Sequence, residues 1–435
     1  MEPSPVRVGI LGCGTVGASL VRLVAAEADT IAARTGLRLQ VTRVAVRDTS
    51  RDRGIDLAPG VLTDDAAALV VDPEVDVVVE TIGGIEPART LLLAALAEGK
   101  PVVTANKELL ATHGAEVVAA AEAAGVDLLF EAAVAGGIPL VRAVRESLLG
   151  EPVRRILGIV NGTTNYILTK MTEEGADYAE ALAEAQALGY AEADPTADVE
   201  GYDAGAKIAI LASIAFGADV VAGDVHHEGI SGITAGDIAY AERTGHVVKL
   251  LAVAERDPAG GAAAPIAVRV HPVLVPATHP LASVRDSFNA VFVQGDAVGD
   301  LMFYGRGAGG DPTASAVLGD LVDASVNLSR RSHASLGVLG PAVIAPVDEG
   351  VSAFYICLDV ADRPGVLATV AGVFGEHGVS ISSMEQEGLG DDAQLMFITH
   401  LAVERDVRAT LDGLRALAEV RRVGSVLRVL SDGAS

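Results

Sequence analysis

Short apolar runs alternate with longer amphipathic stretches over the first 130 residues of the chain. Alternation of buried strands with helices is typical of a parallel sheet built from βαβ units. We therefore predict a nucleotide-type domain over residues 1–135. The strands are expected at 6–10, 41–46, 75–80, 102–104 and 127–130, and the helices from about Val16, over 88–96 and over 115–124.

The pattern changes after residue 135. Longer helices, expected at 179–188 and 204–216, are interspersed with valine-rich strands at 266–270 and 290–294. This mixture predicts an α+β domain over 136–345, which we assign to substrate binding and dimerisation. Glycine and proline punctuate 337–349, as in a linker, and a compact third domain is expected over 350–430.

Composition narrows the function classes. Lys and Arg number 32 against 58 Asp and Glu, a net charge of -26 that disfavours nucleic acid and anionic lipid as partners. The longest apolar stretches, 91–97 and 208–218, are shorter than the roughly 18 to 20 residues that cross a bilayer. Met1–Pro5 lacks the basic region of a secretory leader, so we expect a cytoplasmic protein without a membrane segment.

A GxGxxG motif follows the first predicted strand and opens the first predicted helix. In such a motif the first glycine permits the turn, the second lets the backbone approach a pyrophosphate, and the third lets helix and strand pack closely. This context predicts a Rossmann-type domain that binds NADP or NAD. The expected contacts are Gly12, Gly14, Thr15, Val16 and Gly17.

The end of the second predicted strand bears on the choice of cofactor. An arginine there accommodates the 2'-phosphate of NADP, whereas an acidic residue favours NAD. Arg47 comes first and Asp48 follows, so we favour NADP, with NAD and a solvated charged loop as the alternatives. Ligands gather at the carboxyl ends of parallel strands, where Thr81 and Lys107 are placed.

The segment 189–207, GYAEADPTADVEGYDAGAK, carries five carboxylates within twelve residues. Asp203 and Lys207 are four residues apart and share one helix face. The plain interpretation is a surface ion pair, but the helix that follows is apolar on all sides and should be buried. Lys207 is therefore a candidate acid/base group. Upstream, Glu192 and Asp198 either bind a cation such as an ammonium group or lie on a solvated face.

These residues also resemble a known family. The pattern GYxExDPxxDxxGxDxxxK over 189–207 resembles the signature of homoserine dehydrogenases, and NGTTNYI at 161–167 resembles their second hallmark. GCGTVG at 12–17, TANK at 104–107 and GRGAGGDPTA at 305–314 match as well, so the resemblance covers about residues 5–340.

The resemblance implies reversible, NAD(P)-dependent interconversion of L-aspartate 4-semialdehyde and L-homoserine, a step toward threonine and methionine. It implies Lys207 and Lys107 as acid/base residues, with Lys107 also near the nicotinamide, and Asp203 beside them. Carbonyl reduction fits this assignment, since it needs a hydride donor and a proton donor. The residues implied to hold the substrate are Glu192, Asp198, Tyr190 and Thr163.

Two loops have roles that the resemblance implies. Backbone carbonyls of Glu131, Val134, Gly136 and Ile138 would hold a monovalent cation, Na or K; a Gly-Gly hinge is the alternative. Gly307, in the loop 305–312, would close over the cofactor. Asp311 is expected to be the N-cap of the following helix, and an ordinary helix start is the alternative.

The third domain resembles the ACT amino-acid-sensing domain, a ferredoxin-like fold, through DRPGVL at 362–367 and its β-turn-helix-β order. The resemblance implies an L-threonine effector and a homo-dimer or homo-tetramer. Ser380 departs from the asparagine that many ligand-binding ACT domains carry, and a dimerising module without ligand is the alternative. The residues expected to face the ligand are Gly365, Val366, Leu367, Ser380 and Ile381.

Two other functions fit these residues less well. A phosphorylating aldehyde dehydrogenase needs a catalytic cysteine, but Cys13 lies in the phosphate loop and Cys357 in the third domain. A catalytically silent nucleotide-binding amino-acid sensor would not need Lys107, Asp203 and Lys207.

Overall fold

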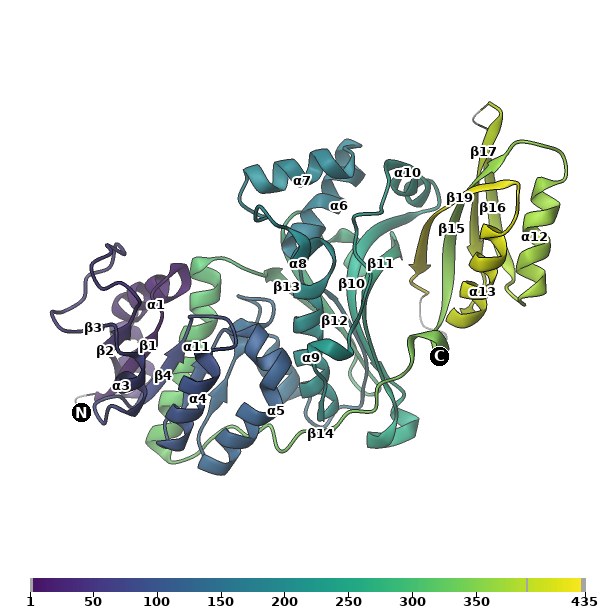
Figure 1. Ribbon diagram of the computed structural model, residues 1–435. Coiled ribbons are helices and arrows are strands. Elements are labelled where there is room, and N and C mark those ends of the chain that lie inside the picture. The colour runs from purple at the N-terminus through teal and green to yellow at the C-terminus, as the bar shows by residue number, and fades with distance from the viewer. Residues whose placement is uncertain (1–2, 389, 432–435) are drawn as a thin grey trace.

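The computed structural model describes residues 3–388 and 390–431. Met1 and Glu2, on which the expectation about a leader partly rests, lie outside the described residues, as does Leu389 of the third domain. The N-terminal part, the middle part and the C-terminal part follow one another along the molecule (Figure 1). No helix of the described residues is long and apolar enough to cross a membrane.

The N-terminal part is built on a parallel sheet with strand order β3-β2-β1-β4-β5-β6. This confirms the Rossmann-type prediction. The strands β4 and β5 in the interior of the sheet are buried on both faces, as parallel strands generally are. The strands are β1 Ser4–Leu11, β2 Leu37–Ala45, β3 Leu62–Thr63, β4 Val77–Glu80, β5 Val102–Thr104 and β6 Leu128–Leu129. The helices are α1 Thr15–Ala26, α2 Ala28–Thr35, α3 Ala66–Val71, α4 Ala88–Ala97 and α5 Lys107–Ala124.

The start of α5 corrects the predicted helix at 115–124. The helix begins at Lys107, where the Asn106 side chain caps it by accepting a hydrogen bond from the Leu109 N–H at 3.1 Å. His113 lies inside the helix with non-helical dihedral angles, so a kink divides the two halves and interrupts the sequence pattern. Lys107 is therefore fixed on the first helical turn, and not in a loop beyond β5.

The middle part is a mixed α+β layer in which helices cover one face of a largely antiparallel sheet (Figure 1). Segments β7, β10, β13 and α6 were not predicted, and the strands at 266–270 and 290–294 extend further than expected. The strands are β7 Val153–Ile159, β10 His246–Arg256, β11 Ile266–Pro276, β12 Phe288–Gly295 and β13 Gly299–Arg306, beside short β8 Ala218–Asp219 and β9 His226–His227. The helices are α6 Gly162–Glu174, α7 Tyr178–Ala187, α8 Thr196–Val199, α9 Tyr202–Phe216 and α10 Ala235–Arg243.

Helix α11, Gly310–Arg330, returns to the N-terminal part and packs beside α1 (Figure 1). Its Val317 and Leu321 belong to the same buried cluster as Val8 and Ile10 of β1. The boundaries at 135 and 345 stay predictions, and the packing shows that a segment from the second range completes the core of the first. The N-cap of α11 is Gly309, and Asp311 is the second helical residue, which corrects the N-cap prediction.

The C-terminal part has the βαββαβ order of an ACT domain, with strand order β19-β15-β17-β16. Its helices bury Val370, Phe374 and Leu411 against the sheet. β19 also pairs in parallel with β11, so the sheet of the middle part continues into this domain. The elements are β15 Val351–Ala361, α12 Val366–Glu376, β16 Ile381–Gly388, β17 Asp392–Thr399, β18 Ala402–Val403, α13 Glu404–Arg415 and β19 Val420–Val429, preceded by β14 Gly340–Pro341.

Candidate active site

The turn from β1 to α1 has the geometry that a dinucleotide needs. Gly12 has φ 95°, a conformation that favours glycine. A Cβ on Gly17 would lie 2.4 Å from the Gly12 carbonyl oxygen, so only glycine lets the helix pack this closely. A Cβ on Gly14 would meet nothing within 4 Å, which leaves open space beside the backbone for a ligand. The turn therefore fits a pyrophosphate.

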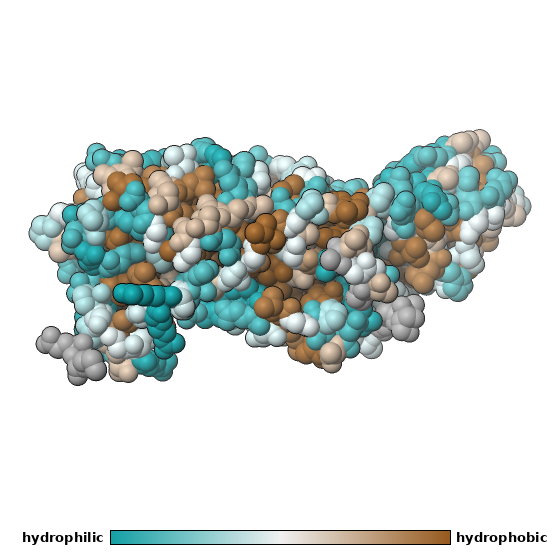
Figure 2. Space-filling model, turned by 90° about the horizontal axis from the view of Figure 1, so that it is seen from below, coloured by the Kyte–Doolittle hydropathy of each residue, from teal (hydrophilic) through white to brown (hydrophobic). Residues whose placement is uncertain are grey.

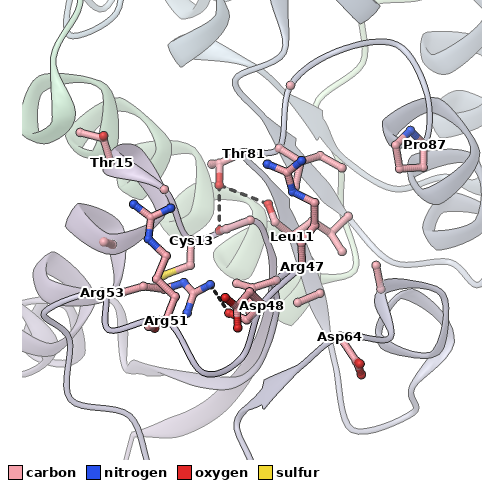
Figure 3. A pocket seen from close by; sticks show the side chains of 18 of the residues that line it. Leu11, Cys13, Thr15, Arg47, Asp48, Arg51, Arg53, Asp64, Thr81 and Pro87 are labelled. Carbon is pink, nitrogen blue, oxygen red and sulfur yellow. Dashed lines mark hydrogen bonds between the residues drawn. The ribbon is translucent and has the colours of Figure 1, made fainter.

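A cavity of about 1060 Å³ opens at this turn (Figure 3). The Thr81 hydroxyl closes its floor by donating to the carbonyl oxygens of Leu11 and Gly12, at 3.2 and 3.1 Å. Val16, Gly17, Lys107 and Gly307, also predicted for the cofactor, do not line it. The predicted residues that do line it are Gly12, Gly14, Thr15, Arg47 and Thr81.

Four arginines line this cavity. Arg47 lies beside Asp48 at its wall, and Arg22, Arg51 and Arg53 also line it (Figure 3). Arg53 is held in place because its Nη2 donates to the Asp48 carbonyl oxygen at 2.5 Å. The sequence assigns Arg47 as the contact, with Arg51 and Arg53 following it, and the structure adds Arg22. The cluster supplies the positive charge that a phosphate group requires.

Glu80 supports the floor of the cavity and was not assigned from the sequence. The residue is fully buried at the end of β4. Its carboxylate accepts hydrogen bonds from the N–H groups of Ile82 and Gly83, at 2.7 and 2.9 Å, and from the Thr104 hydroxyl at 2.5 Å. These bonds fix the turn after β4 to the neighbouring strand β5.

A lysine–carboxylate cluster joins the N-terminal part to the middle part. Asp203, in the first turn of α9, lies 2.7 Å from the Lys107 Nζ through Oδ1 and 2.7 Å from the Lys207 Nζ through Oδ2. The Lys207 Nζ also donates to the Val160 carbonyl oxygen at 2.7 Å. The Lys107 side chain is 38% exposed and that of Lys207 12%, so the two ammonium groups differ in access to solvent.

The electrostatics of the cluster follow from these contacts. Burial alone would raise the pKa of the Asp203 carboxyl, but the charges of Lys207 and Lys107 and their hydrogen bonds lower it well below its usual range. Burial opposes the charge of Lys107, yet the attraction of Asp203 raises the pKa of this ammonium group overall. Burial raises the pKa of Asp198 despite the hydrogen bond from Asn161. Asp203 therefore stays ionised and keeps Lys107 protonated at neutral pH.

Asn161 connects two of the carboxylates and was missed as a site residue. Its Nδ2 donates to Asp198 Oδ1 at 2.6 Å and to Asp203 Oδ2 at 2.9 Å, while its Oδ1 caps α6 by accepting from the Thr164 N–H at 2.9 Å. An asparagine directly after a strand and before a Gly-Thr-Thr helix start is a recognisable N-cap pattern. That pattern identifies the cap but not the contact with Asp203, which comes from α9.

The remaining residues predicted for the substrate lie around the turn after α7. The Thr163 hydroxyl donates to the Tyr190 carbonyl oxygen at 2.6 Å, which ties this turn to α6. The Tyr190 ring packs against Tyr166, with centroids 5.0 Å apart, and remains 46% exposed. Glu192 is exposed, and its carbonyl oxygen accepts a hydrogen bond from Gln186 Nε2 at 3.0 Å, which fixes the backbone of this turn.

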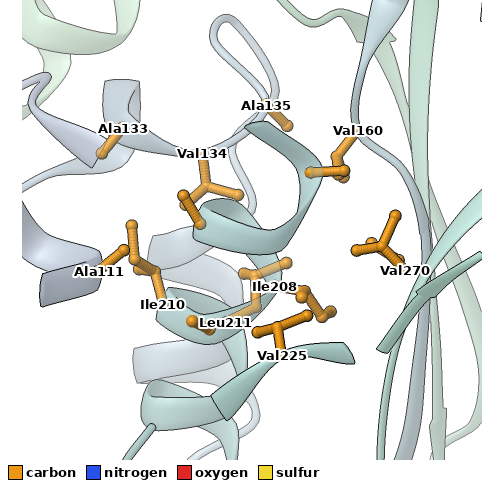
Figure 4. Close-up of a cluster of buried hydrophobic side chains, with 14 of the residues drawn as sticks. Ala111, Ala133, Val134, Ala135, Val160, Ile208, Ile210, Leu211, Val225 and Val270 are labelled. Atoms are coloured by element: carbon orange, nitrogen blue, oxygen red, sulfur yellow. The ribbon is translucent and has the colours of Figure 1, made fainter. Parts of the chain in front are cut away.

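Helix α9 is held rigidly behind these charged groups (Figure 4). Ile208 and Leu211 are fully buried, and Ile210 is 3% exposed. They pack between Val134 of the N-terminal side and Val270 of β11. This confirms the prediction of a buried helix, and it explains why Asp203 and Lys207 at the helix start have fixed positions.

The predicted cation loop has carbonyl groups available for a ligand. Ala135 and Gly136 both have positive φ, 57° and 52°, which turns the chain sharply. The carbonyl oxygens of Val134 and Gly136 accept no backbone hydrogen bond within the described residues, whereas those of Glu131 and Ile138 each accept one. The Glu131 carboxylate is occupied by the N–H groups of Leu140, Val141 and Arg142, at 2.6 to 2.9 Å.

A second cavity, of about 380 Å³, lies at the turn between β15 and α12. Gly365, Val366 and Leu367 line it together with Gln386. Ser380 and Ile381 do not, because Ile381 begins β16 opposite Thr399, and Gln386 lies five residues further along the strand, a distance of roughly 17 Å.

A dinucleotide-type cavity together with lysines held by an ionised carboxylate characterises an oxidoreductase that uses a nicotinamide cofactor. Comparison with known proteins narrows this class. The family model "Homoserine dehydrogenase, NAD binding domain" matches residues 12–131, "Homoserine dehydrogenase" matches 139–322, and "ACT domain" matches 355–419.

Relatives cover nearly the whole chain. The homoserine dehydrogenase of Corynebacterium glutamicum is 52% identical over 99% of this chain and 96% of its own length, and that of Bacillus subtilis is 42% identical over 98% and 99%. The crystal structure of a homoserine dehydrogenase from Thiobacillus denitrificans has a TM-score of 0.92 at 42% identity and covers 99% of both chains. The chain therefore belongs to the homoserine dehydrogenase family and is an oxidoreductase with an ACT domain.

A further solved structure bears on the cofactor. A hyperthermophilic archaeal homoserine dehydrogenase in complex with NADPH has a TM-score of 0.63 at 28% identity, over 74% of this chain and 98% of that chain. Together with the family model for NAD binding, it supports a nucleotide cofactor for this chain. The comparisons give no support to the alternative of a catalytically silent sensor.

Proposed function

We propose that this chain catalyses the reversible, NADPH-dependent reduction of L-aspartate 4-semialdehyde to L-homoserine, with Lys207 and Lys107 as the acid/base residues. The observation that carries the proposal is the bridging of both ammonium groups by Asp203. Lys207 is fixed by Asp203 and by the Val160 carbonyl, and Lys107 starts the helix next to the parallel sheet.

The lysines account for the proton in this reaction. When bound, a nicotinamide cofactor would supply a hydride for the aldehyde carbon. Lys207 donates a proton to the carbonyl oxygen, and its positive charge stabilises the alkoxide that develops there. Asp203 accepts no proton in this step, because its lowered pKa keeps it ionised. In the reverse direction the neutral amine removes the hydroxyl proton of homoserine.

Carboxylates near the lysines suit the ammonium group of an amino acid. Asp198 is joined to the lysine cluster by Asn161, whose Nδ2 donates to both Asp198 and Asp203. Glu192 lies on the exposed turn that the Thr163 hydroxyl binds through the Tyr190 carbonyl oxygen. We assign Asp198 and Glu192 to the substrate ammonium group. Tyr190 and Thr163 shape the turn on which Glu192 lies.

NADP is the proposed cofactor because of the arginine cluster. Arg47, Arg51 and Arg53 line the cavity together with Arg22, and a 2'-phosphate adds charge that these side chains bind. Backbone carbonyls of Glu131, Val134, Gly136 and Ile138 are the proposed ligands of a Na or K ion, since carbonyl oxygens suit hard cations.

The ACT domain is the proposed site of feedback by L-threonine. The cavity at Gly365, Val366 and Leu367 is the candidate subsite, and Ser380 and Ile381 would face the ligand from a neighbouring subunit. This arrangement requires a homo-dimer or homo-tetramer.

Exposed apolar side chains support the proposed oligomer. Hydrophobic side chains gather over the middle of the face in Figure 2, and the edge strand β13 exposes Met302 and Tyr304 to 37% and 54%.

The test of the proposed activity is NADPH oxidation with L-aspartate 4-semialdehyde, measured with and without L-threonine. We expect turnover with this substrate, and inhibition by threonine that Gln386→Ala weakens, since Gln386 lines the cavity. Coupling of this kind amounts to about 5- to 150-fold in affinity. Binding of NADPH without turnover would instead support a silent sensor.

A further inference from the structure

Asn289 is a buried polar residue that the active-site cluster does not use. It lies on β12 and is 1% exposed. Its Oδ1 has no hydrogen-bond partner among the described residues. Buried acceptors are rarely left unpaired, because each has lost its water without gaining another donor. The Asn289 Oδ1 can therefore accept a hydrogen bond from a donor that comes within reach in another conformation of the protein.

The Asn289 side chain packs against the glycine loop, residues 305–310. A Cβ on Gly307 would lie 1.9 Å from Asn289 Nδ2 and 2.5 Å from Oδ1, so the amide occupies the place of a side chain at Gly307. On its other side, a Cβ on Gly136 would lie 2.3 Å from the Gly307 carbonyl oxygen. The amide, the glycine loop and the predicted cation loop therefore form three layers in direct contact.

The glycine loop carries the donors that the amide lacks. The backbone N–H groups of Gly307, Ala308 and Gly309 form no hydrogen bond within the part of the chain that the structure describes. Beyond them the loop reaches the cofactor turn, since a Cβ on Gly310 would lie 2.9 Å from Thr15 Cγ2. Thr15 in turn lines the dinucleotide cavity.

We infer that Asn289 is a positioning residue for cofactor binding: its Oδ1 accepts a hydrogen bond from an N–H of residues 307–309 when the glycine loop closes on the dinucleotide. The inference rests on the proposed closing of this loop over the cofactor. The Asn289 oxygen is unpaired without the dinucleotide and paired with it, so its hydrogen bond stabilises only the complex. The amide therefore raises the affinity for the dinucleotide and lowers the stability of the fold without it.

The test compares Asn289→Leu and Asn289→Ser with the unmodified chain. Neither variant keeps the amide oxygen, and leucine has nearly the same shape as asparagine. We expect the Kd for NADPH to rise about three- to tenfold in each, the effect of one hydrogen bond. The melting temperature of free Asn289→Leu should stay unchanged or rise, because an unpaired buried acceptor has been removed.

Two controls separate this role from a structural one. Asn289→Asp keeps an acceptor oxygen and should bind NADPH with nearly the original Kd. Phe292→Leu alters the opposite face of β12, in a different buried cluster, and should lower the melting temperature without changing the Kd.

An original Kd in either Asn289→Leu or Asn289→Ser would overturn the inference, as would a lower melting temperature of Asn289→Leu with unchanged binding. Binding is measured without substrate, so a failure of the proposed reaction leaves this test intact. If the unmodified chain binds NADH instead of NADPH, the same comparison is made with NADH.

Discussion

At the scale of single residues, Asp203 is the group on which the proposed site depends. One carboxylate holds two ammonium groups that come from different parts of the chain, each at 2.7 Å. The pair with Lys207 was predictable, because the two residues are four apart on one helix. The contact with Lys107 was not, since it depends on how α5 packs against α9.

Replacing Asp203 tests this arrangement through pH. Asp203→Asn removes the charge that raises the pKa of Lys107, so this pKa should fall. Because Lys107 is the second proposed acid/base residue beside the proton donor Lys207, the alkaline limb of the pH profile of kcat/KM should move to lower pH. The value of kcat/KM at neutral pH should fall about 10²-fold. A limb that stays in place would show that Lys107 does not titrate in the reaction.

At the scale of secondary structure, the cofactor turn shows what sequence can and cannot establish. The glycine spacing predicted both the turn and its ligand, because each glycine has a separate steric reason. The prediction for the start of α5 was wrong because a kink at His113 interrupts the helical pattern. The prediction for the N-cap of α11 was wrong because the helix begins at Gly310, after Gly309, and not at Asp311. Strands β7 and β10 were missed since their apolar residues are interrupted by arginines and a lysine.

Gly17 and Gly14 form a matched pair of substitutions. Gly17→Ala would place a methyl group 2.4 Å from the Gly12 carbonyl and should destabilise the protein by about 1 to 3 kcal/mol, besides weakening cofactor binding. Gly14→Ala meets open space, so we expect normal stability but weakened binding, because the methyl group enters the space for the pyrophosphate. Thermal melting and cofactor titration of both variants check this. Equal melting temperatures would contradict the packing argument.

At the scale of the whole molecule, the ACT domain is fastened to the middle part by charged groups as well as by the shared sheet. Arg428 of β19 donates from Nη1 and Nη2 to the Glu228 carboxylate, both at 2.9 Å, and from Nη2 to Glu404 at 2.8 Å. The sequence predicted an ACT module, but not this junction, because Glu228 of the middle part lies 200 positions before Arg428 in the chain. The bond to Glu404 lies within the ACT domain and holds Arg428 in place.

Arg428→Leu should destabilise the protein by about 3 to 5 kcal/mol at pH 7, because the buried Glu404 and the partly exposed Glu228 lose the buried arginine that they share. Burial alone would raise the pKa of Glu228, but hydrogen bonds from His226 and Arg428 lower it well below its usual range. A carboxyl with a lowered pKa stabilises the fold above its unfolded pKa, about 4.3, and this contribution is lost as the pH falls.

The difference between the Arg428→Leu variant and the original chain should therefore shrink below about pH 4.3. Urea unfolding of both across this range measures it. Arg421→Leu is the control, since Arg421 forms an exposed ion pair with Asp392 and should matter little at any pH. A difference that stays constant with pH would contradict the role of the Glu228 charge.

The central claim is that Lys207 supplies the proton for aldehyde reduction, and the most direct measurement is kcat together with the cofactor Kd of Lys207→Met. We predict a fall in kcat of about 10²- to 10⁴-fold with nearly unchanged NADPH binding, because Lys207 contacts Asp203 and the Val160 carbonyl and does not line the dinucleotide cavity. Lys170→Met removes a partly buried lysine of α6 that pairs with Glu174 and Glu184 and not with Asp203, and it should leave both values unchanged. A Lys207→Met enzyme that keeps more than roughly a tenth of the original kcat would contradict the account.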